Sequence, residues 1–365
     1  MERLEKISAK IPKINLIADF LKKLEEEEVE KAVLLMSGRF CHEWERKELD
    51  VSWNTLVKVW EELGINTEKL IELYKKTGDP GDALKKILEE GKISRQMTLL
   101  FQKPTIRFIY ETLNKIAEIF GEGSRDKKKA ILKSLYSNLS PVEAKFLTRI
   151  ILGDMRYGVS DGLLLESISK ASLIPLEELR RAYMIIGDIG ITARKAIFHR
   201  EDVKNVKITV FHPLKPMLAE KADSVLEALK EHDFNTAFEI KFDGIRAQIH
   251  KKGERVKIFS RRLKEVTEYF PEIVEEIRKK VKGGEVVLEG EIIGEKDGKP
   301  LPFQVLMRRV RREKDFERIR KEIPVKLYLF DILYLDGKML IDLPFIERRK
   351  ILEEITDGIE KSPMI

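Results

Sequence analysis

The sequence predicts a protein of two domains, an all-α domain over residues 1–205 followed by an antiparallel-rich α+β domain over residues 206–365. Three observations support this prediction. A chain of 365 residues is too long for one ordinary domain. Apolar residues recur at helical spacing up to about residue 200. Beyond that point apolar and polar residues alternate with a period of two, which is typical of strands with one buried face.

The composition limits the classes of function. The net charge of +6 permits a polyanionic partner without demonstrating one, and heavy use of Lys, Arg and Glu resembles the composition of thermophile proteins. The single cysteine, Cys41, excludes an internal disulfide and fits a reducing compartment. With five scattered histidines and no second cysteine, a structural zinc site is not expected, so we expect Cys41 to be a small core residue.

The sequence contains no targeting or membrane signal that we recognise. No apolar run approaches the length of a membrane span, and residues 1–5 lack the core of a signal peptide. We therefore expect an intracellular, cytoplasmic protein without a membrane partner, and we expect it to be a monomer.

Start and stop signals divide the first 200 residues into helices. Ser140, Pro141 and Glu143 place a cap, a first-turn proline and a third-position glutamate in order, which predicts a helix start. Glycine-rich breaks fall at residues 78–81, 121–124 and 153–162.

The second of these breaks holds groups that can contact phosphate. Gly123, Ser124 and Arg125 offer free backbone amides, a hydroxyl and a cation, which suit the backbone of a nucleic acid. The same residues also fit a plain turn between two helices with a solvated basic first turn. The spacing alone does not decide between these interpretations.

The third break has a similar double interpretation. Arg156, Tyr157 and Gly158 place a cation, an aromatic ring and a flexible residue together in a loop before another helix. This combination can approach a groove closely, or it can simply connect two helices.

The character of the sequence changes near Asn205, where we place the domain boundary. Helical spacing gives way to the segment 206–211, and Pro213 and Pro216 then interrupt the chain. Beyond the boundary, strands dominate.

The stretch 238–249 organises the second domain and predicts a β-hairpin. Apolar and polar residues alternate on both sides of Asp243-Gly244, a turn signal. Glu239 and Lys241 therefore project from one polar face, with Arg246 close by. A lysine in this position is either part of a solvated strand face or an amine nucleophile beside a guanidinium that can hold phosphate. The short motif around it occurs too often by chance to decide alone.

Later segments of the second domain deliver further polar groups. They are a strand over 255–259 followed by Ser260 and Arg261, a helix over 271–281, a strand over 286–293 with Glu289 and Glu291 on one face, and a strand over 325–335 containing Phe330 and Asp331. No Gly-rich phosphate-binding loop and no dinucleotide fingerprint is present, so a nucleotide must be held by side chains on the sheet.

A basic run covers residues 308–312. It fits either a surface along a polyanion or an ordinary solvated face.

Four motifs, taken in order, resemble those of ATP-dependent DNA ligases, and the nearest resemblance is to the archaeal replicative type. The motifs are Lys241 to Arg246, Ser260-Arg261, Leu288 to Glu291, and Leu329 to Gly337. Three further segments look like parts of the same family, namely 213–219 before the nucleotidyl domain, and 121–124 and 152–159 in the DNA-binding domain. The resemblance covers nearly the whole chain.

The resemblance implies a role for each domain. The first would be the DNA-binding domain, contacting duplex backbone through Gly123, Ser124, Arg125, Arg156, Tyr157 and Gly158. The second would be the nucleotidyltransferase, or adenylation, domain. A C-terminal OB-fold domain that family members carry is missing from this sequence, which stops at Ile365. We therefore expect a C-terminally incomplete ligase that seals nicks poorly on its own.

The resemblance also implies the chemistry of the second domain. Lys241 would be the catalytic residue, attacking the α-phosphate of ATP to form a covalent lysine–AMP intermediate. Glu239 and Phe330 would contact the adenine, and Arg246 and Arg261 the ribose and phosphates.

Further ligands and partners follow from the resemblance. Glu291 would contact ribose or bind Mg²⁺, which the chemistry of polyphosphate also favours. The implied partner is nicked duplex DNA, in replication, repair and recombination, with a sliding clamp as a further candidate.

Two alternatives remain at the level of motifs. An RNA ligase or mRNA-capping guanylyltransferase shares lysine-nucleotidyl chemistry, although the helical first half argues against it. A non-catalytic DNA-binding protein with a degenerate nucleotide site is the second alternative. The intact Lys241, Glu291 and two arginines argue against degeneration, and the missing C-terminal motifs argue for it.

Overall fold

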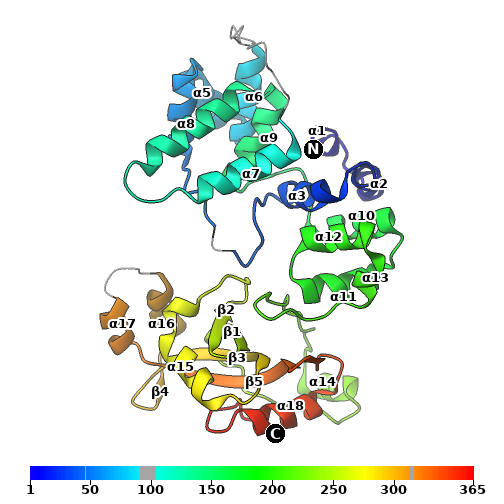
Figure 1. Ribbon diagram of the computed structural model, residues 1–365, viewed down its shortest axis with the longest axis vertical. Helices are drawn as coiled ribbons and strands as arrows, with labels where there is room; N and C mark the ends of the chain where they lie inside the picture. The colour runs from blue at the N-terminus through cyan, green and yellow to red at the C-terminus, as the bar shows by residue number, and fades with distance from the viewer. Residues whose placement is uncertain (46, 91–103, 312–315) are drawn as a thin grey trace. The chain divides into compact units, whose positions relative to one another are not determined.

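The computed structural model describes residues 1–45, 47–90, 104–311 and 316–365 (Figure 1). The chain divides into two compact units. The helical unit consists of Met1–Tyr183 and Asp188–Asn205, and the sheet unit consists of Met184–Gly187 and Val206–Ile365. In the described residues, no helix is both long enough and apolar enough to cross a membrane.

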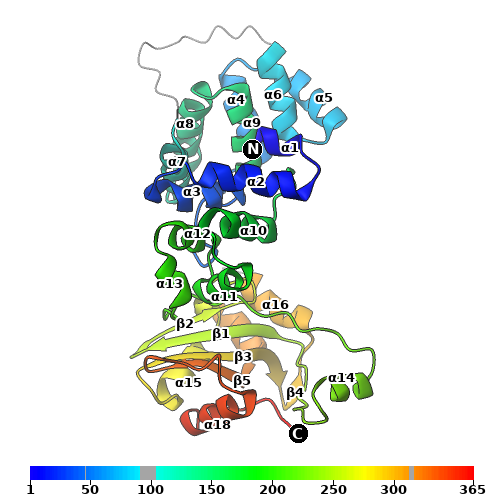
Figure 2. The same cartoon turned by 90° about the vertical axis from the view of Figure 1, so that its right-hand side faces the viewer.

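The helical unit is built from α-helices, as the apolar spacing predicted (Figure 2). Its helices are α1 (Glu2–Glu5), α2 (Lys10–Leu21), α3 (Glu26–Met36), α4 (Trp53–Glu62), α5 (Thr67–Thr77), α6 (Pro80–Glu90), α7 (Ile106–Ala117), α8 (Ser124–Ser137), α9 (Pro141–Leu152), α10 (Asp161–Ser172), α11 (Leu176–Ile186, which ends in the sheet unit), α12 (Ile189–Phe198) and α13 (Arg200–Lys204).

The start of α9 follows the capping signal in the sequence. Ser140 accepts a hydrogen bond from the Glu143 amide, and the Glu143 carboxylate accepts one from the Ser140 amide, with Pro141 in the first turn. The helix packs into a core around Trp60, whose ring meets the ring of Tyr136 edge-on at 5.7 Å. Local signals therefore place α9, and burial of its apolar face holds it there.

The sheet unit contains an antiparallel sheet with helices, as predicted. Its strands are β1 (Ile245–Lys252), β2 (Arg255–Phe259), β3 (Glu285–Lys296), β4 (Lys299–Pro300), β5 (Val325–Leu335) and β6 (Lys338–Met339), in the order β2-β1-β3-β5-β6, with β4 on β3. Its helices are α14 (Val225–Glu231), α15 (Pro271–Lys280), α16 (Phe303–Arg311), α17 (Phe316–Glu322) and α18 (Phe345–Ile355), with a 3₁₀ turn at Thr267–Tyr269.

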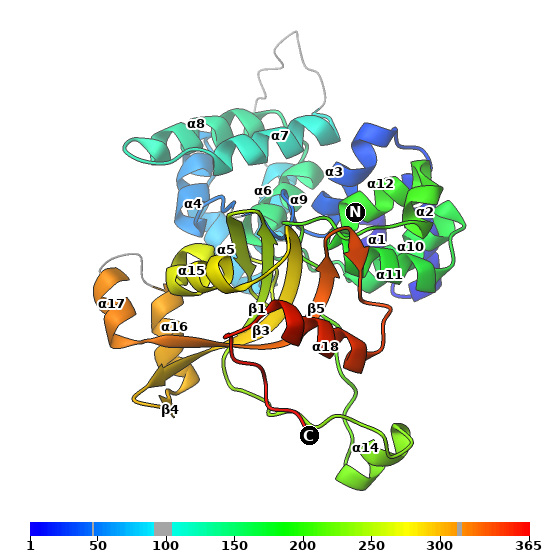
Figure 3. The ribbon, with the colours of Figure 1, turned by 60° about the horizontal axis from the view of Figure 1, so that its bottom comes forward.

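One face of this sheet carries the core of the unit. Ile249 of β1 and Leu288 of β3 are fully buried against Ile277 of α15 and Leu352 of α18. Figure 2 shows both helices on the same side of the sheet, and Figure 3 shows α18 beside β5. Because side chains alternate along a strand, the polar residues of β1 and β3 are directed to the opposite face.

The hairpin predicted over 238–249 is wrong in its first arm. Only an isolated bridge between Glu239 and Met364 forms there, and β1 begins at Ile245. Phe238 is 46% exposed and Ile240 is 56% exposed, so their alternation buries no apolar face. The actual hairpin joins β1 to β2. Period-two alternation in a short run also fits an extended segment that pairs elsewhere.

The basic run is interrupted by a buried arginine. Arg309 of α16 is fully buried, and its guanidinium donates to the carbonyl oxygens of Tyr269 at 2.8 Å and Ile323 at 2.9 Å and pairs with Glu272. This residue therefore fastens α16 within the unit and is not available to a polyanion. Arg312 lies outside the described residues.

Cys41 is half-buried, with its sulfur 4.0 Å from the carbonyl oxygen of Lys47. The expectation of a core cysteine is therefore wrong. It lies in the irregular segment after α3, where neighbouring chain covers it only in part.

Candidate functional site

The polar face of the sheet gathers charged residues from three strands. In the pairing of β1 with β3, Arg246 lies opposite Glu291, and Gln248 lies opposite Glu289. All four side chains therefore share the face away from the core. Arg246 and Glu291 are half-buried, whereas Gln248 and Glu289 are buried, so the cluster runs from the surface inwards.

Arg246 has a defined orientation. Its Nε donates to Oε2 of Glu289 at 3.0 Å, and its guanidinium carbon lies 5.7 Å from the centre of the Phe330 ring. Burial raises the pKa of Glu289, and the charge of Arg246 acts against that rise. The buried carboxylate therefore holds one edge of the guanidinium, while Arg246 stays about 31% exposed and can present its remaining N–H groups to a ligand.

Phe330 occupies an irregularity in the pairing of β3 with β5. Asp331 lies opposite Glu289 and Leu329 lies opposite Gly290, so Phe330 is the extra residue between them. A bulge of this kind redirects a side chain at the edge of a regular ladder. Here it gives a half-buried aromatic ring beside Arg246.

Asp331 is fixed by a two-point ion pair. Arg348 of α18 donates from Nε to Oδ1 at 2.7 Å and from its terminal nitrogen to Oδ2 at 2.8 Å. Such bidentate pairs define the geometry of both partners. The pair ties β5 to α18 one residue after Phe330.

Lys241 lies on the exposed segment that leads into β1. In the described part of the chain its amine makes no hydrogen bond or ion pair. The next residue, Phe242, stacks on Tyr328 of β5 with ring centres 4.4 Å apart, and Tyr328 lies opposite Glu291. Phe242 therefore attaches the segment to the sheet, and the free amine belongs to Lys241, the residue before it.

The carboxyl group of Glu291 lies in the field of that amine. Burial raises the pKa of Glu291, whereas the positive charge of Lys241 and a hydrogen bond from the Gly244 backbone act in the opposite direction. The structure thus brings Lys241, Arg246 and Glu291 into one electrostatic neighbourhood.

Gly244 allows this approach because a side chain would not fit. A Cβ at this position would lie 2.4 Å from the carbonyl oxygen of Ile292 and 3.0 Å from Cγ of Glu291. The backbone of the Lys241 segment therefore lies directly against β3, which only glycine permits.

We expect Gly244→Ala to loosen this attachment at a cost of about 1–3 kcal/mol, since backbone atoms must move apart to admit the methyl group. Amide hydrogen exchange of β1 and β3 should become faster in the variant. Gly284→Ala is the control, because its nearest neighbour is a side-chain oxygen of Asp336 at 3.3 Å. Equal exchange in both variants would contradict the steric explanation.

Glu239 is held by residues near the end of the sequence. It bridges to Met364, and its carboxylate lies 3.5 Å from a terminal nitrogen of Arg349. Burial raises the pKa of Glu239, Arg349 lowers it, and Asp331 raises it further. Glu239 thus lies within electrostatic reach of Asp331, the residue that follows Phe330.

Arg261, another predicted residue of the sheet unit, lies away from the Arg246–Glu289 pair. It lies exposed in the turn after β2. Because Phe259 pairs with Gln248 in antiparallel register, this turn lies near the level of Arg246. Its guanidinium is therefore accessible at the same end of the sheet.

The predicted metal ligand is compatible with a hard cation. Among the described residues, no group of three or more His, Cys, Asp or Glu side chains is arranged to hold a metal ion. Glu291 is a half-buried carboxylate facing Lys241 and Arg246. One such carboxylate fits Mg²⁺, which keeps several waters and takes its other ligands from phosphate oxygens.

The predicted loop at residues 121–125 forms a tight turn between α7 and α8. Gly121 and Gly123 both have positive φ angles, of 82° and 71°, and α8 begins at Ser124 without a side-chain cap. Ser124 is half-buried and Arg125 is exposed. The turn presents the first backbone amides of a 14-residue helix together with a hydroxyl and a cation.

The second predicted loop contains a correction. Tyr157 is only 3% exposed, its hydroxyl donates to the Met36 carbonyl, and its ring meets Phe146 edge-on. The ring is therefore a core group of the helical unit and is not accessible to a ligand. The sequence did not distinguish a buried anchor from an exposed aromatic, since both occur between a cation and a glycine.

The neighbours of Tyr157 remain at the surface. Arg156 pairs with Asp154 at 2.6 Å and donates to the carbonyl oxygen of Gly78 at 2.5 Å. Gly158 has a φ of 68° and lies against the amine of Lys13, which donates to the Tyr157 carbonyl oxygen at 2.9 Å. The buried Tyr157 side chain thus holds the neighbouring exposed Arg156 in place.

A network of buried ion pairs contacts the loop around Arg156 from the interior of the helical unit. Arg149 of α9 is 3% exposed, pairs with Asp79 at 2.6 Å and with Glu5, and donates to the Met155 carbonyl oxygen at 3.1 Å. Burial alone would raise the pKa of Asp79, but hydrogen bonds from Arg149 and the backbone lower it below its ordinary value. Arg149 therefore joins two of the predicted glycine-rich breaks.

Three residues of the polar face were not predicted as site residues. Glu289, Gln248 and His250 are buried polar groups that no sequence argument singled out as ligands or supports. The available signal was the alternation of Arg246, Gln248 and His250 along β1, which puts three polar residues in a row on one face.

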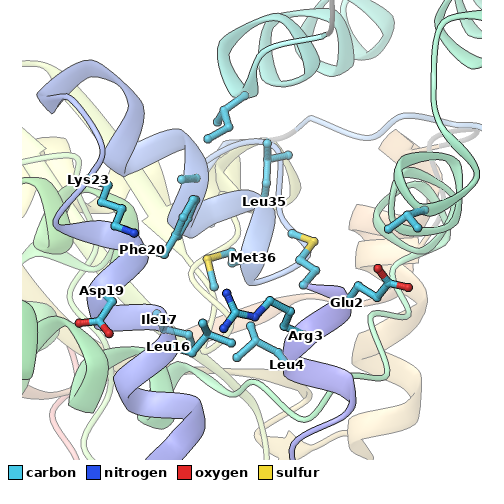
Figure 4. Close-up of a pocket in the computed structure, with 14 residues that line it drawn as sticks. Glu2, Arg3, Leu4, Leu16, Ile17, Asp19, Phe20, Lys23, Leu35 and Met36 are labelled. Atoms are coloured by element: carbon cyan, nitrogen blue, oxygen red, sulfur yellow. The ribbon is translucent and has the colours of Figure 1, made fainter.

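A cavity of about 690 Å³ lies elsewhere, within the helical unit (Figure 4). Its wall is mainly apolar and includes Ile17, Phe20, Leu35 and Met36, and Arg3 also lines it. None of the predicted site residues lines it.

Comparisons with known proteins give a consistent result for both units. The family model described as "DNA ligase N terminus" matches residues 1–169, and that described as "ATP dependent DNA ligase domain" matches residues 216–365. A DNA ligase of Thermococcus fumicolans is 41% identical over 362 residues, which are 98% of this chain and 64% of the relative. A DNA ligase of Archaeoglobus fulgidus is 40% identical over 365 residues, which are 99% of this chain and 64% of the relative.

This chain therefore spans slightly less than two thirds of the length of these relatives. A solved structure titled "Pmar-Lig_Pre." has a similar fold, with a TM-score of 0.50 at 16% identity. The likeness covers 100% of this chain and 65% of that chain.

Proposed function

Since the chain belongs to the ATP-dependent DNA ligase family, we propose that it binds duplex DNA and takes up AMP from ATP on Lys241, as part of the sealing of nicks. The observation that carries this proposal is the arrangement around Lys241. An accessible amine lies beside Glu291, with Arg246 and the Phe330 ring on the same face of one sheet.

In the proposed first step, the Lys241 amine attacks the α-phosphorus of ATP. A P–N bond forms, the bond from the α-phosphorus to its oxygen bridge breaks, and pyrophosphate leaves with the electron pair of that bond. The amine must lose its proton for the attack. Contacts of Phe242 and Gly244 with the sheet fix the position of the backbone beside Lys241, while the exposed Lys241 side chain can extend towards a bound nucleotide.

The surrounding groups suit the parts of ATP. The Phe330 ring offers a stacking face for adenine, and the Glu239 carboxylate would accept a hydrogen bond from an amino group on the base. Arg246 and Arg261 can neutralise phosphate oxygens, since guanidinium groups bind them in a planar fork. Because Glu289 already holds one edge of the Arg246 guanidinium, the side chain loses less conformational entropy when the triphosphate binds.

Glu291 would hold a Mg²⁺ ion or the ribose. A bound Mg²⁺ supplies positive charge where charge accumulates on the leaving phosphates. The half-buried position of Glu291 beside two cations suits either role.

Two further steps complete sealing in this proposal. AMP passes from Lys241 to the 5′-phosphate at a nick, and the adjacent 3′-hydroxyl then attacks that phosphate and releases AMP. Because the relatives are longer than this chain, we propose that an OB-fold domain and its catalytic groups serve these later steps. We accordingly expect this 365-residue chain to seal nicks slowly by itself.

The helical unit would hold the DNA backbone. We propose that Gly123, Ser124 and Arg125 form one contact, with Arg156 and Gly158 forming another. Tyr157 contributes indirectly, because its buried ring fixes Arg156 and Gly158. Contacts of this kind read charge and shape rather than base sequence.

Removal of the loop cations should weaken binding to any duplex. We expect Arg125→Ala and Arg156→Ala each to lower the slope of log affinity against log salt by about one, because each loses about one phosphate contact. Fluorescence anisotropy of a labelled nicked duplex across a salt series measures this slope. Lys69→Ala is the control, because this exposed lysine belongs to α5 and lies in neither of the proposed contact loops. A slope unchanged in the loop variants would contradict the proposed contacts.

The direct test of the proposed function is covalent labelling. The chain is incubated with ATP and Mg²⁺, and intact-mass spectrometry is used to detect one added adenylate. GTP serves as a parallel substrate, since a GMP adduct would favour the guanylyltransferase chemistry. Absence of the AMP adduct would contradict the proposal.

A further inference from the structure

A row of buried polar side chains extends inwards from Arg246 along β1. Gln248 is 5% exposed and His250 is fully buried, and both share the face of Arg246. The apolar face of the same strand already supplies the core through Ala247 and Ile249. Buried amide and imidazole groups cost free energy unless every polar atom is paired, so this row has a reason other than packing.

Gln248 uses all the hydrogen-bonding capacity of its amide. Its Oε1 accepts from the Leu214 N–H at 2.7 Å and from His250 Nε2 at 2.9 Å. Its Nε2 donates to the Leu214 carbonyl oxygen at 3.2 Å and to Oε1 of Glu289 at 2.8 Å. Two acceptor sites and two donor hydrogens are thus occupied, which fixes the amide in one orientation.

His250 is fixed in one tautomer by the same row. Its Nδ1 accepts from the backbone N–H of Phe211 at 2.9 Å, so the proton lies on Nε2, which donates to Gln248. Burial lowers the pKa of His250 to about 3, and the ring is therefore neutral near pH 7. The row begins at the backbone of the segment that enters the sheet unit.

The other end of the row is the guanidinium of Arg246. Glu289 receives Gln248 on Oε1 and Arg246 on Oε2, so the direction of its carboxylate transmits the orientation of one to the other. Arg246 in turn lies over Phe330 and opposite Glu291. The chain of hydrogen bonds is continuous from Phe211 to the proposed phosphate-binding group.

We propose that Gln248 and His250 are positioning residues, which orient Arg246 through Glu289 and lock that orientation to the backbone of residues 211–214. This inference rests on the proposed function for its effect on adenylation, but the orientation itself does not. A fully satisfied buried network gives a single geometry, and loss of one member releases the others. The inner face of the sheet thereby preorganises a group that works at the surface.

The orientation is tested directly by the Nε–H signal of Arg246. In protein labelled with ¹⁵N-arginine, we assign this signal by its loss in Arg246→Lys and measure its hydrogen exchange. We expect exchange to quicken about tenfold in Gln248→Met, an apolar replacement of similar length, because Glu289 loses its second partner. Unchanged exchange in Gln248→Met would overturn the inference whether or not the protein takes up AMP.

Rescue by a conservative variant separates positioning from packing. His250→Gln can accept from Phe211 and donate to Gln248, whereas His250→Leu can do neither. We expect slow Arg246 exchange to persist in the glutamine variant and to be lost in the leucine variant. Ile249→Val removes core volume on the opposite face of the same strand, and we expect it to leave the signal unchanged. Equal effects in all three variants would show a merely structural role.

The rate of AMP transfer to Lys241 provides the second measurement. In single-turnover labelling we expect Gln248→Met and His250→Leu to react about tenfold more slowly than the unsubstituted chain, with His250→Gln and Ile249→Val close to it. If the unsubstituted chain takes up no AMP, the proposed function fails, and the exchange measurement still decides the positioning. If it takes up AMP and Gln248→Met reacts equally fast, the inference fails alone.

Discussion

Lys241→Ala is expected to take up no AMP at all. The variant removes the only atom that would form the P–N bond, so the loss is of a reaction step and not of a rate factor. Intact-mass spectrometry after incubation with ATP and Mg²⁺ measures the result as the fraction of chain carrying one adenylate. Because Lys241 is exposed and makes no hydrogen bond or ion pair in the described residues, the variant should unfold like the unsubstituted chain.

Two controls make this result specific. Lys252→Ala removes another exposed lysine, at the far end of β1, which pairs with Glu285 at 2.6 Å. It should take up AMP normally. Lys241→Arg retains a positive charge but offers no free amine, so it should also lack the adduct. Full labelling of Lys241→Ala would assign the nucleophile to another residue and refute the proposed site.

Arg149→Met should destabilise the helical unit by about 3–5 kcal/mol, which is the usual cost of removing one partner of a buried ion pair. Asp79, which is 5% exposed, would lose its guanidinium partner, although its carboxylate would still accept backbone hydrogen bonds. The loop that contains Met155 would also lose the hydrogen bond that Arg149 donates to the Met155 carbonyl oxygen. We therefore expect weaker DNA binding as a secondary effect.

The tryptophans make this measurable in the intact chain. All three tryptophans of the sequence, Trp44, Trp53 and Trp60, lie in the helical unit, so their fluorescence in a urea titration follows that unit alone. The midpoint should move strongly to lower urea in Arg149→Met. This separates its unfolding from that of the sheet unit, which a single two-state analysis of the whole chain would mix.

Matched variants test whether the cost arises from the uncompensated charge. Asp79→Asn added to Arg149→Met removes that charge, and we expect it to recover part of the lost stability. Arg107→Met removes an exposed arginine that pairs with Glu111, and should change the stability by less than about 0.5 kcal/mol. A loss of similar size in Arg107→Met would show that burial is not the cause.

Local signals in the sequence predicted much of the fold. The bounds of β5 agree with the predicted strand, because a long alternating run ends at the turn residues Asp336 and Gly337. The capping box at Ser140 was likewise readable because cap, proline and glutamate all act within one helical turn. The resemblance to ligases is supported by family models covering both halves of the chain.

The remaining features depend on contacts between distant residues. The segment around Glu239 has the alternation of a strand, but its partner is Met364, and no local pattern announces a pairing across 125 positions of sequence. Tyr157 was readable as a residue of a loop, but its burial depends on Met36 and Phe146. Likewise, the hydrogen bond from Arg246 to Glu289 can be anticipated only when the register of β1 against β3 is known.

The position of Phe330 as an extra residue in β5 has a consequence for specificity. Without Phe330, Leu329 and Asp331 would follow one another opposite Gly290 and Glu289 in an ordinary ladder. Strand pairing therefore makes no demand on the identity of this residue. The protein can change the size and chemistry of the surface offered to a planar base at one position while the register of its sheet, and the core behind it, stay the same.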